Sequence, residues 1–156
     1  MTATGRTVVW LTLGVGLVRF GTEVINSISH GPYFNWQGAF SQAYLAIMIQ
    51  WAATFCGGAL YAFLAGHRGR PTLGDCSLGG ASVGFGGALL GEVLSGLFLV
   101  AVASYRSVDL FLGSLIGCSV LVNYFLYPFL GVLVGGAGGG AVGLLTAGWS
   151  GPDRAE

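Results

Sequence analysis

Five polar residues stand inside otherwise apolar stretches of the sequence and are its candidates for chemistry: Arg19, Glu23, Gln50, Glu92 and Asn123. An ionisable group inside a bilayer costs about 3 kcal/mol or more, so it needs a partner and often marks a function. Arg19 and Glu23 are four residues apart, which places them on one face of a helix. The others stand at comparable depths in their own stretches, so we expect all five side chains to form one polar layer within a membrane.

Two interpretations of this layer are open. In the first, a buried ion pair with amide hydrogen bonds fixes the register of the helices and does nothing more. In the second, Glu92 takes up and releases a proton in a transport cycle, with Arg19 and Glu23 as modulating partners. The second interpretation draws on the charge count, because two carboxylates and one arginine leave about one carboxylate uncompensated.

One motif is typical of a different chemistry. Residues 80–84 read GASVG and match the G-x-S-x-G of serine hydrolases, and His67 and Asp75 stand shortly before it. That motif acts only at a sharp turn between a strand and a helix. Here it lies inside a glycine-rich apolar stretch, so we predict that the chain is not an enzyme and has no catalytic residues.

The remaining reactive side chains do not form a pattern for a metal or a cofactor. His30 and His67 are too isolated to share a metal, and the sequence holds no cofactor-binding motif in its proper context. The cysteines lack the C-x-x-C spacing and stand in or beside apolar runs, where a free cysteine acts as a small hydrophobe: Cys56, Cys76 and Cys118. We therefore expect neither a metal nor a cofactor.

The composition explains why so few side chains are candidates. Of the 156 residues, 54% are hydrophobic and 8% are charged, and the mean hydropathy is +0.77. A soluble domain carries about 25% charged residues. Six arginines balance six acidic residues and there is no lysine, so no basic patch is available to bind nucleic acid. These numbers indicate an all-α integral membrane protein whose main surroundings are the lipid bilayer.

Four apolar regions are long enough to span a bilayer, which takes roughly 20 residues. They cover residues 7–27, 39–66, 76–104 and 110–148, and they form a single membrane domain over residues 1–156. The last region has 39 residues, which is about 58 Å of helix, and contains Pro128 near its middle. We expect either a long fourth helix that is broken near Pro128 or a turn there that adds a fifth span, and we favour four spans.

The arginines indicate an orientation. Arg6 precedes the first span and the loop of residues 67–75 contains two further arginines, whereas residues 30–38 carry no lysine or arginine. Because cytoplasmic loops are enriched in basic residues, we expect the N-terminus and the loop 67–75 on the cytoplasmic side. Arg106 alone favours the opposite orientation, and the side of the C-terminus stays open.

Glycine is far more frequent than usual, with 29 residues. Two sets recur at helical spacing and form stripes: Gly80, Gly84, Gly87 and Gly91, and then Gly131, Gly135, Gly139 and Gly143. Within a bilayer, small residues at this spacing let helix backbones approach closely, as in a glycine zipper. We expect both stripes to be helix contacts, within the chain or else in a homo-oligomer or with a membrane protein partner. In the dense run 136–140 we expect a loose turn or an unwound segment.

The stretch of residues 54–91 reads TFCGGALYAFLAGHRGRPTLGDCSLGGASVGFGGALLG. Its glycine-rich helix end, short arginine-containing loop and glycine-rich helix start resemble those of small haloarchaeal membrane proteins that are grouped as a domain of unknown function. The later stretch FLGVLVGGAGGGAVGLL is similar to the last helix of that family. The resemblance covers about half of the chain and implies four helices in an archaeal plasma membrane, with no activity. The first helix departs from the family in carrying Arg19 and Glu23.

Two functions follow from these patterns. The first is a structural or accessory membrane protein without catalysis, whose glycine stripes pack against a second copy or a partner. The second is a small proton-coupled or ion-conducting carrier that uses Glu92 with Arg19 and Glu23. The sequence favours the first, because its packing motifs are extensive and its chemical groups are few.

Overall fold

The protein is built from helices in the residues that the computed structural model describes, which are 3–29, 36–68, 71–106 and 126–149. The helices are α1 (Ala3–Ser29), α2 (Trp36–Arg68), α3 (Leu73–Arg106) and α6 (Tyr127–Trp149). Each contains a segment long and apolar enough to cross a membrane: Gly5–Ile25, Tyr44–His67, Leu73–Phe98 and Tyr127–Thr146. The predicted all-helical architecture with four such helices is therefore confirmed for this part of the chain.

Helix α6 begins at Tyr127, so Pro128 lies in its first turn. A proline is well tolerated there, because the first N–H groups of a helix have no partner within it. Pro128 is therefore the second residue of α6, and the earlier part of the predicted fourth region, residues 110–125, lies outside the described residues. The expected loose or unwound segment at 136–140 is wrong, because these residues are helical.

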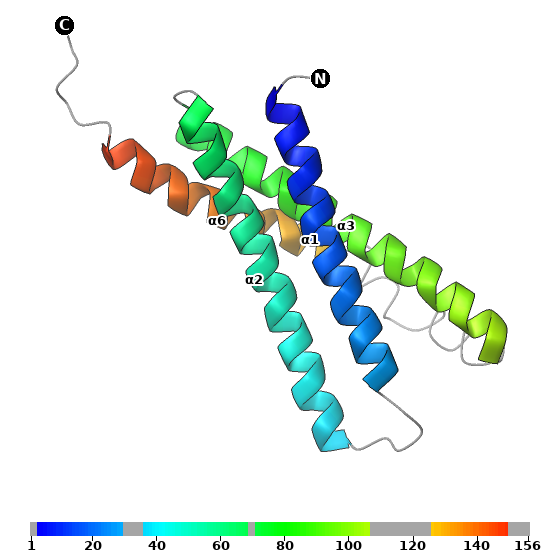
Figure 1. Ribbon diagram of the computed structural model, residues 1–156. Coiled ribbons are helices and arrows are strands. Elements are labelled where there is room, and N and C mark those ends of the chain that lie inside the picture. Colours follow the sequence, from blue (N-terminus) through cyan, green and yellow to red (C-terminus); the bar gives the residue numbers. More distant parts are fainter. Residues whose placement is uncertain (1–2, 30–35, 69–70, 107–125, 150–156) are drawn as a thin grey trace, which may run out of the picture.

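The helices pack with alternating directions. Figure 1 shows α1 and α2 side by side, with α3 crossing behind them and α6 lying across α2 and α3. Both α2 and α3 contact each of the other described helices, and only the pair α1 and α6 has no backbone contact in this part of the chain. The start of α1, the end of α2 and the start of α3 lie at the same end of the molecule (Figure 1).

Helices α3 and α6 pack through glycines on both sides. A Cβ atom added to Gly84 would meet the carbonyl group of Gly131, and one added to Gly80 would meet that of Gly135. Gly135 also lies against Gly58 of α2, so three helix backbones meet at this one residue. The whole glycine stripe of α6 lies against α3: Gly131, Gly135, Gly139 and Gly143.

The glycine stripe of α3 serves two neighbours. Its first half, Gly80 and Gly84, faces α6, whereas its second half faces α1. A Cβ atom on Gly87 would lie 2.7 Å from the Cβ atom of Val15, and one on Gly91 would meet the stem of Arg19. Every glycine of the two predicted stripes therefore lies against a neighbouring helix of the same chain.

A small apolar core lies where α1, α2 and α3 meet. It contains Val15, Tyr61 and Val83, one from each helix. Gly57 lies against Val15, and Gly79 lies against the ring of Tyr61. Glycine therefore makes room for large side chains as well as for neighbouring backbones.

Helix α3 begins with a reciprocal cap. The amide of Asp75 donates to the Thr72 hydroxyl at 3.1 Å, and the amide of Thr72 donates to the Asp75 carboxylate at 3.0 Å. The Thr72 hydroxyl also donates to the same carboxylate oxygen at 2.8 Å. This capping box satisfies amides that the first turn of a helix leaves unpaired, and it fixes where α3 begins.

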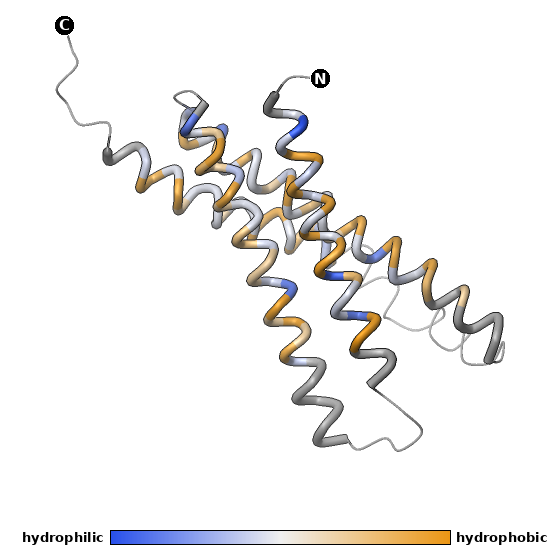
Figure 2. The backbone as a smooth tube through the Cα atoms, viewed as in Figure 1, coloured by the Kyte–Doolittle hydropathy of each residue, from blue (hydrophilic) through white to orange (hydrophobic). Residues whose placement is uncertain are grey.

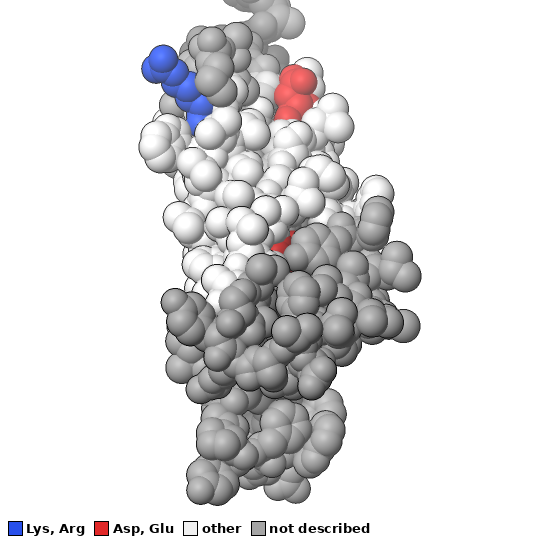
Figure 3. Space-filling model, turned by 90° about the vertical axis from the view of Figure 1, so that its right-hand side faces the viewer, with Lys and Arg blue, Asp and Glu red and all other residues white. Residues whose placement is uncertain are grey.

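The outer surface is apolar along most of each helix. Trp10, Leu78 and Leu145 are 72%, 70% and 72% exposed. Figure 2 shows hydrophobic positions along all four helices, with hydrophilic ones near helix ends and at a few places well inside α1, α2 and α3. On the face in Figure 3, the described surface is uncharged between the charged side chains at one end and a small acidic patch near the middle. This distribution is compatible with a membrane environment.

Replacing Gly84 by alanine is expected to weaken the helix packing strongly. The new Cβ atom would meet the carbonyl group of Gly131, which cannot move without shifting α6. Overpacking of this kind costs about 1–3 kcal/mol or more, so the midpoint of thermal unfolding in detergent should fall by several degrees. Gly14→Ala is the matched control, because a Cβ atom there would meet no atom of a neighbouring helix within 4 Å. Equal midpoints for the two variants contradict the described contact.

Candidate functional site

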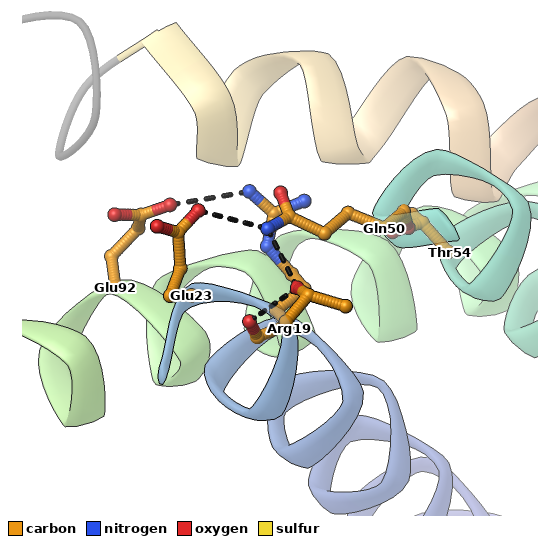
Figure 4. A network of polar contacts seen from close by, with 6 residues as sticks. Arg19, Glu23, Gln50, Thr54 and Glu92 are labelled. Carbon is orange, nitrogen blue, oxygen red and sulfur yellow. Dashed lines mark hydrogen bonds and ion pairs between the residues drawn. The ribbon is translucent and has the colours of Figure 1, made fainter. Parts of the chain in front are cut away.

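Four of the five residues predicted to form a polar layer lie in one cluster inside the helix packing (Figure 4). Arg19 of α1 and Glu92 of α3 form an ion pair, with 3.2 Å between Nη2 and Oε1. Their side chains are 1% and 10% exposed, so the pair is shielded from its surroundings. Burying either charge alone is expensive, and the pair offsets part of that cost because the two charges attract each other.

A second part of the cluster joins α1 to α2. Gln50 donates from Nε2 to the hydroxyl of Thr22 and to Oε1 of Glu23, at 2.9 Å each. Thr22 in turn donates to the carbonyl oxygen of Arg19 at 2.7 Å, and Thr54 donates to that of Gln50 at 2.8 Å. Glu23 is therefore held by an amide of the neighbouring helix.

Two aromatic rings lie beside the Arg19 guanidinium. Its Cζ atom is 5.5 Å from the ring centroid of Trp51 in α2 and 5.5 Å from that of Tyr127 in α6. The two rings also contact each other, with centroids 5.8 Å apart. Cation–π attraction contributes about 0.5–2 kcal/mol. Through Glu92 and these rings, the single side chain of Arg19 reaches each of the other three described helices.

A glycine makes the room that this arginine occupies. A Cβ atom on Gly91 would lie 2.7 Å from Cβ and 3.3 Å from Cδ of Arg19. The stem of Arg19 therefore runs over the Cα atom of Gly91, and its head reaches Glu92, the next residue of α3. The glycine stripe and the polar cluster depend on each other at this point.

Several buried donor atoms of α1 and α3 have no hydrogen-bond partner. Within the described ranges these are Nε and Nη1 of Arg19 and the hydroxyl oxygen of Ser95, a residue that is 7% exposed. A buried donor without a partner costs about 1–3 kcal/mol. The two nitrogens of the Arg19 guanidinium, together with the Ser95 hydroxyl on α3, are therefore groups that could bind a hydrogen-bond acceptor.

Sequence analysis missed part of the cluster. It did not single out Thr22, Thr54, Trp51 and Tyr127. The two threonines could have been predicted from the sequence, because they follow Arg19 and Gln50 by three and four residues and so share a helix face with them. The two rings come from other helices, and no spacing in the sequence brings them to the arginine. Asn123, the fifth predicted residue, lies outside the described residues.

The other candidate residues lie apart from the cluster. Ser82, from the hydrolase-like motif, is exposed, and its hydroxyl donates within its own helix at 2.8 Å. Asp75 belongs to the cap of α3, and Nδ1 of His67 lies 3.0 Å from the carbonyl oxygen of Phe63. In the part of the chain that the structure describes, no three His, Cys, Asp or Glu residues are grouped for a metal ion.

Comparisons of the chain with protein-family models, with curated proteins and with solved structures give no match. The chemistry of the cluster is therefore read from its own groups. Arg19, Glu23 and Glu92 together carry a net charge of −1 when all three are ionised, and one proton brings that charge to zero. Because an isolated net charge is unfavourable in apolar surroundings, the cluster is suited to binding a proton.

Removing the arginine alone is expected to destabilise the protein more than removing the ion pair. Arg19→Met leaves the Glu92 carboxylate buried without this cation, which costs about 3–5 kcal/mol. The double variant Arg19→Met/Glu92→Gln removes the stranded charge and should recover much of the loss in thermal unfolding midpoint. Arg6→Met, at an exposed arginine of the same helix, is the control. A double variant as unstable as Arg19→Met contradicts the energetic coupling of the pair.

Proposed function

We propose that the chain is a multi-pass integral membrane protein of the plasma membrane, with its N-terminus and the connection from α2 to α3 on the cytoplasmic side. Four helices of membrane-spanning length and an apolar exterior support the membrane location. The start of α1, the end of α2 and the start of α3 lie at the same end of the molecule (Figure 1). The arginines near both segments in the sequence fit the enrichment of basic residues in cytoplasmic loops.

The orientation is tested by cysteine labelling in intact cells. In a variant without the three natural cysteines, Thr2→Cys and Gly69→Cys should react with a membrane-impermeant maleimide only after the cells are opened. Asn35→Cys, in the connection from α1 to α2, is the control and should react in intact cells. Labelling of residues 2 and 69 in intact cells reverses the orientation.

Within this membrane protein we infer a small proton-coupled or ion-conducting carrier in which Glu92 takes up and releases the proton. The observation that supports it is the cluster of a buried carboxylate, a half-buried carboxylate and a single buried guanidinium, drawn from α1 and α3. A charged group at membrane depth costs several kcal/mol and is retained where it serves a function. The glycine stripes contribute the helix packing that holds this cluster, because their contacts lie within the chain.

In this mechanism the proton adds to a carboxylate oxygen of Glu92 and later leaves it for water on the other side. Protonation removes the negative partner of Arg19, so the attraction between α1 and α3 weakens in that state. Glu23, which Gln50 holds at 2.9 Å, supplies the remaining negative charge near the guanidinium. Arg19 and Glu23 therefore act as positioning residues that set when Glu92 is charged.

The purified chain in liposomes should carry protons down a pH gradient, measured with a pH-sensitive dye inside the vesicles. Glu92→Gln, which keeps the size of the side chain but cannot be ionised, should lower the flux at least tenfold. His67→Glu, at an exposed position near the end of α2, serves as the carboxylate control. A wild-type flux equal to that of protein-free liposomes, or a Glu92→Gln flux equal to the wild type, contradicts the proposal.

A second candidate is a structural or accessory membrane subunit that assembles with a partner or with a second copy. It is favoured by the hydrogen bonds inside the cluster, because the ion pair and the amide contact also fix the register of α1 against its neighbours. A chain that gives no flux, and that native mass spectrometry finds in a stable complex with another protein, supports this role. In that case Glu92→Gln reduces assembly and has no flux to change.

A further inference from the structure

The guanidinium of Arg19 is only partly used by its ion pair. Nη2 is bound to Glu92, whereas Nε and Nη1 have no hydrogen-bond partner among the described residues, although the side chain is 1% exposed. An arginine in this state presents several N–H groups in a fixed planar arrangement, which is the usual protein group for binding an anion.

A second unused donor lies on the helix that faces this arginine. The hydroxyl of Ser95 has no partner in the described part of the chain, and the residue is 7% exposed. Gly91 and Phe98, which precede and follow Ser95 on α3, both contact α1, through Arg19 and through Phe20. Residues 91, 95 and 98 share one helix face, so Ser95 also faces α1.

We propose that Arg19 and Ser95 form a binding site for a small monovalent anion of the halide type, such as chloride, and that the anion binds together with a proton on Glu92. The proton removes the negative partner of Arg19, and the anion takes its place beside the guanidinium. Protonation brings Arg19, Glu23 and Glu92 to a net charge of zero, so the anion enters a cluster that no longer carries a net negative charge. The part of the proposal that concerns the proton rests on the proposed function of Glu92, whereas the anion site does not.

The groups around this site fit a proton-linked anion. Arg19 and Glu23 face it from α1, Glu92 from α3 and Tyr127 from α6. Helix α2 contributes the amide of Gln50 and the ring of Trp51, which do not titrate. With Glu92 ionised the two carboxylates repel an anion, and with Glu92 protonated that repulsion falls while the guanidinium becomes available.

Trp51 provides the reporter, because its ring centroid is 5.5 Å from the Arg19 Cζ atom. The experiment uses the full chain in lipid nanodiscs with the other tryptophans replaced: Trp10→Phe, Trp36→Phe and Trp149→Phe. Bromide, a heavy-atom quencher, is titrated at constant ionic strength with gluconate as the balancing anion. We expect saturable quenching that chloride reverses. Above the pH range in which Glu92 titrates, the half-saturating bromide concentration should rise about tenfold per pH unit.

Three variants assign the site. Ser95→Ala removes one donor and should raise the half-saturating bromide concentration about tenfold. Glu92→Gln cannot be ionised, so its bromide binding should no longer depend on pH. Ser82→Ala is the matched control on the same helix, since that hydroxyl is exposed and bonds within α3.

The outcomes separate this proposal from the proposed function. Bromide quenching that never saturates, or that is the same in Ser95→Ala as in the wild type, overturns the anion site. In that case, proton flux that continues unchanged in chloride-free liposomes still supports the carrier function. Saturable quenching in a chain without proton flux supports the anion site and contradicts the carrier. Saturable quenching that does not vary with pH, or that varies with pH in Glu92→Gln, overturns the coupling to Glu92.

Discussion

The described structure depends on one buried cation, the guanidinium of Arg19. From α1 it reaches the carboxylate of Glu92 in α3 and the rings of Trp51 and Tyr127 in α2 and α6. A charge in apolar surroundings must be compensated on several sides at once, so the positions of four helices are constrained by one side chain. Although α1 and α6 share no backbone contact among the described residues, this arginine brings α1 into contact with Tyr127 of α6.

The glycines have a different role, which is to let helix backbones pack closely. Within a bilayer the hydrophobic effect does not drive helices together, so close packing must stabilise their contact. Gly84 contacts Gly131, and Gly135 contacts both α2 and α3. The backbones of α2, α3 and α6 are therefore in direct contact. At Gly91 the missing Cβ atom makes room for the long side chain of Arg19. Close packing and the buried charge are therefore not competing features of this fold, because the missing Cβ atoms serve both.

The four helices could be predicted because apolar runs of about 20 residues and helical glycine spacing are local properties of the sequence. The meeting of Arg19, Gln50 and Glu92 could be predicted from their depth along each run. The division of the glycine stripe of α3 between α6 and α1 could not be predicted. The spacing of residues in the sequence shows which of them share a helix face, but it does not show which helix packs against that face. The helical state of 136–140 was missed for a related reason: a glycine run that is loose in isolation becomes ordered where neighbouring backbones fill the space.

The ion pair joins residues that are 73 positions apart, and this separation has a consequence for how the chain is made. Synthesis completes α1 long before Glu92 exists, so Arg19 must be accommodated without its final partner during that interval. Glu23 is the only acidic residue before Asp75 in the sequence, and it stands one turn after Arg19 on the same helix. The carboxylate that Gln50 holds in the finished protein is thus the counter-charge that the nascent first helix brings with it.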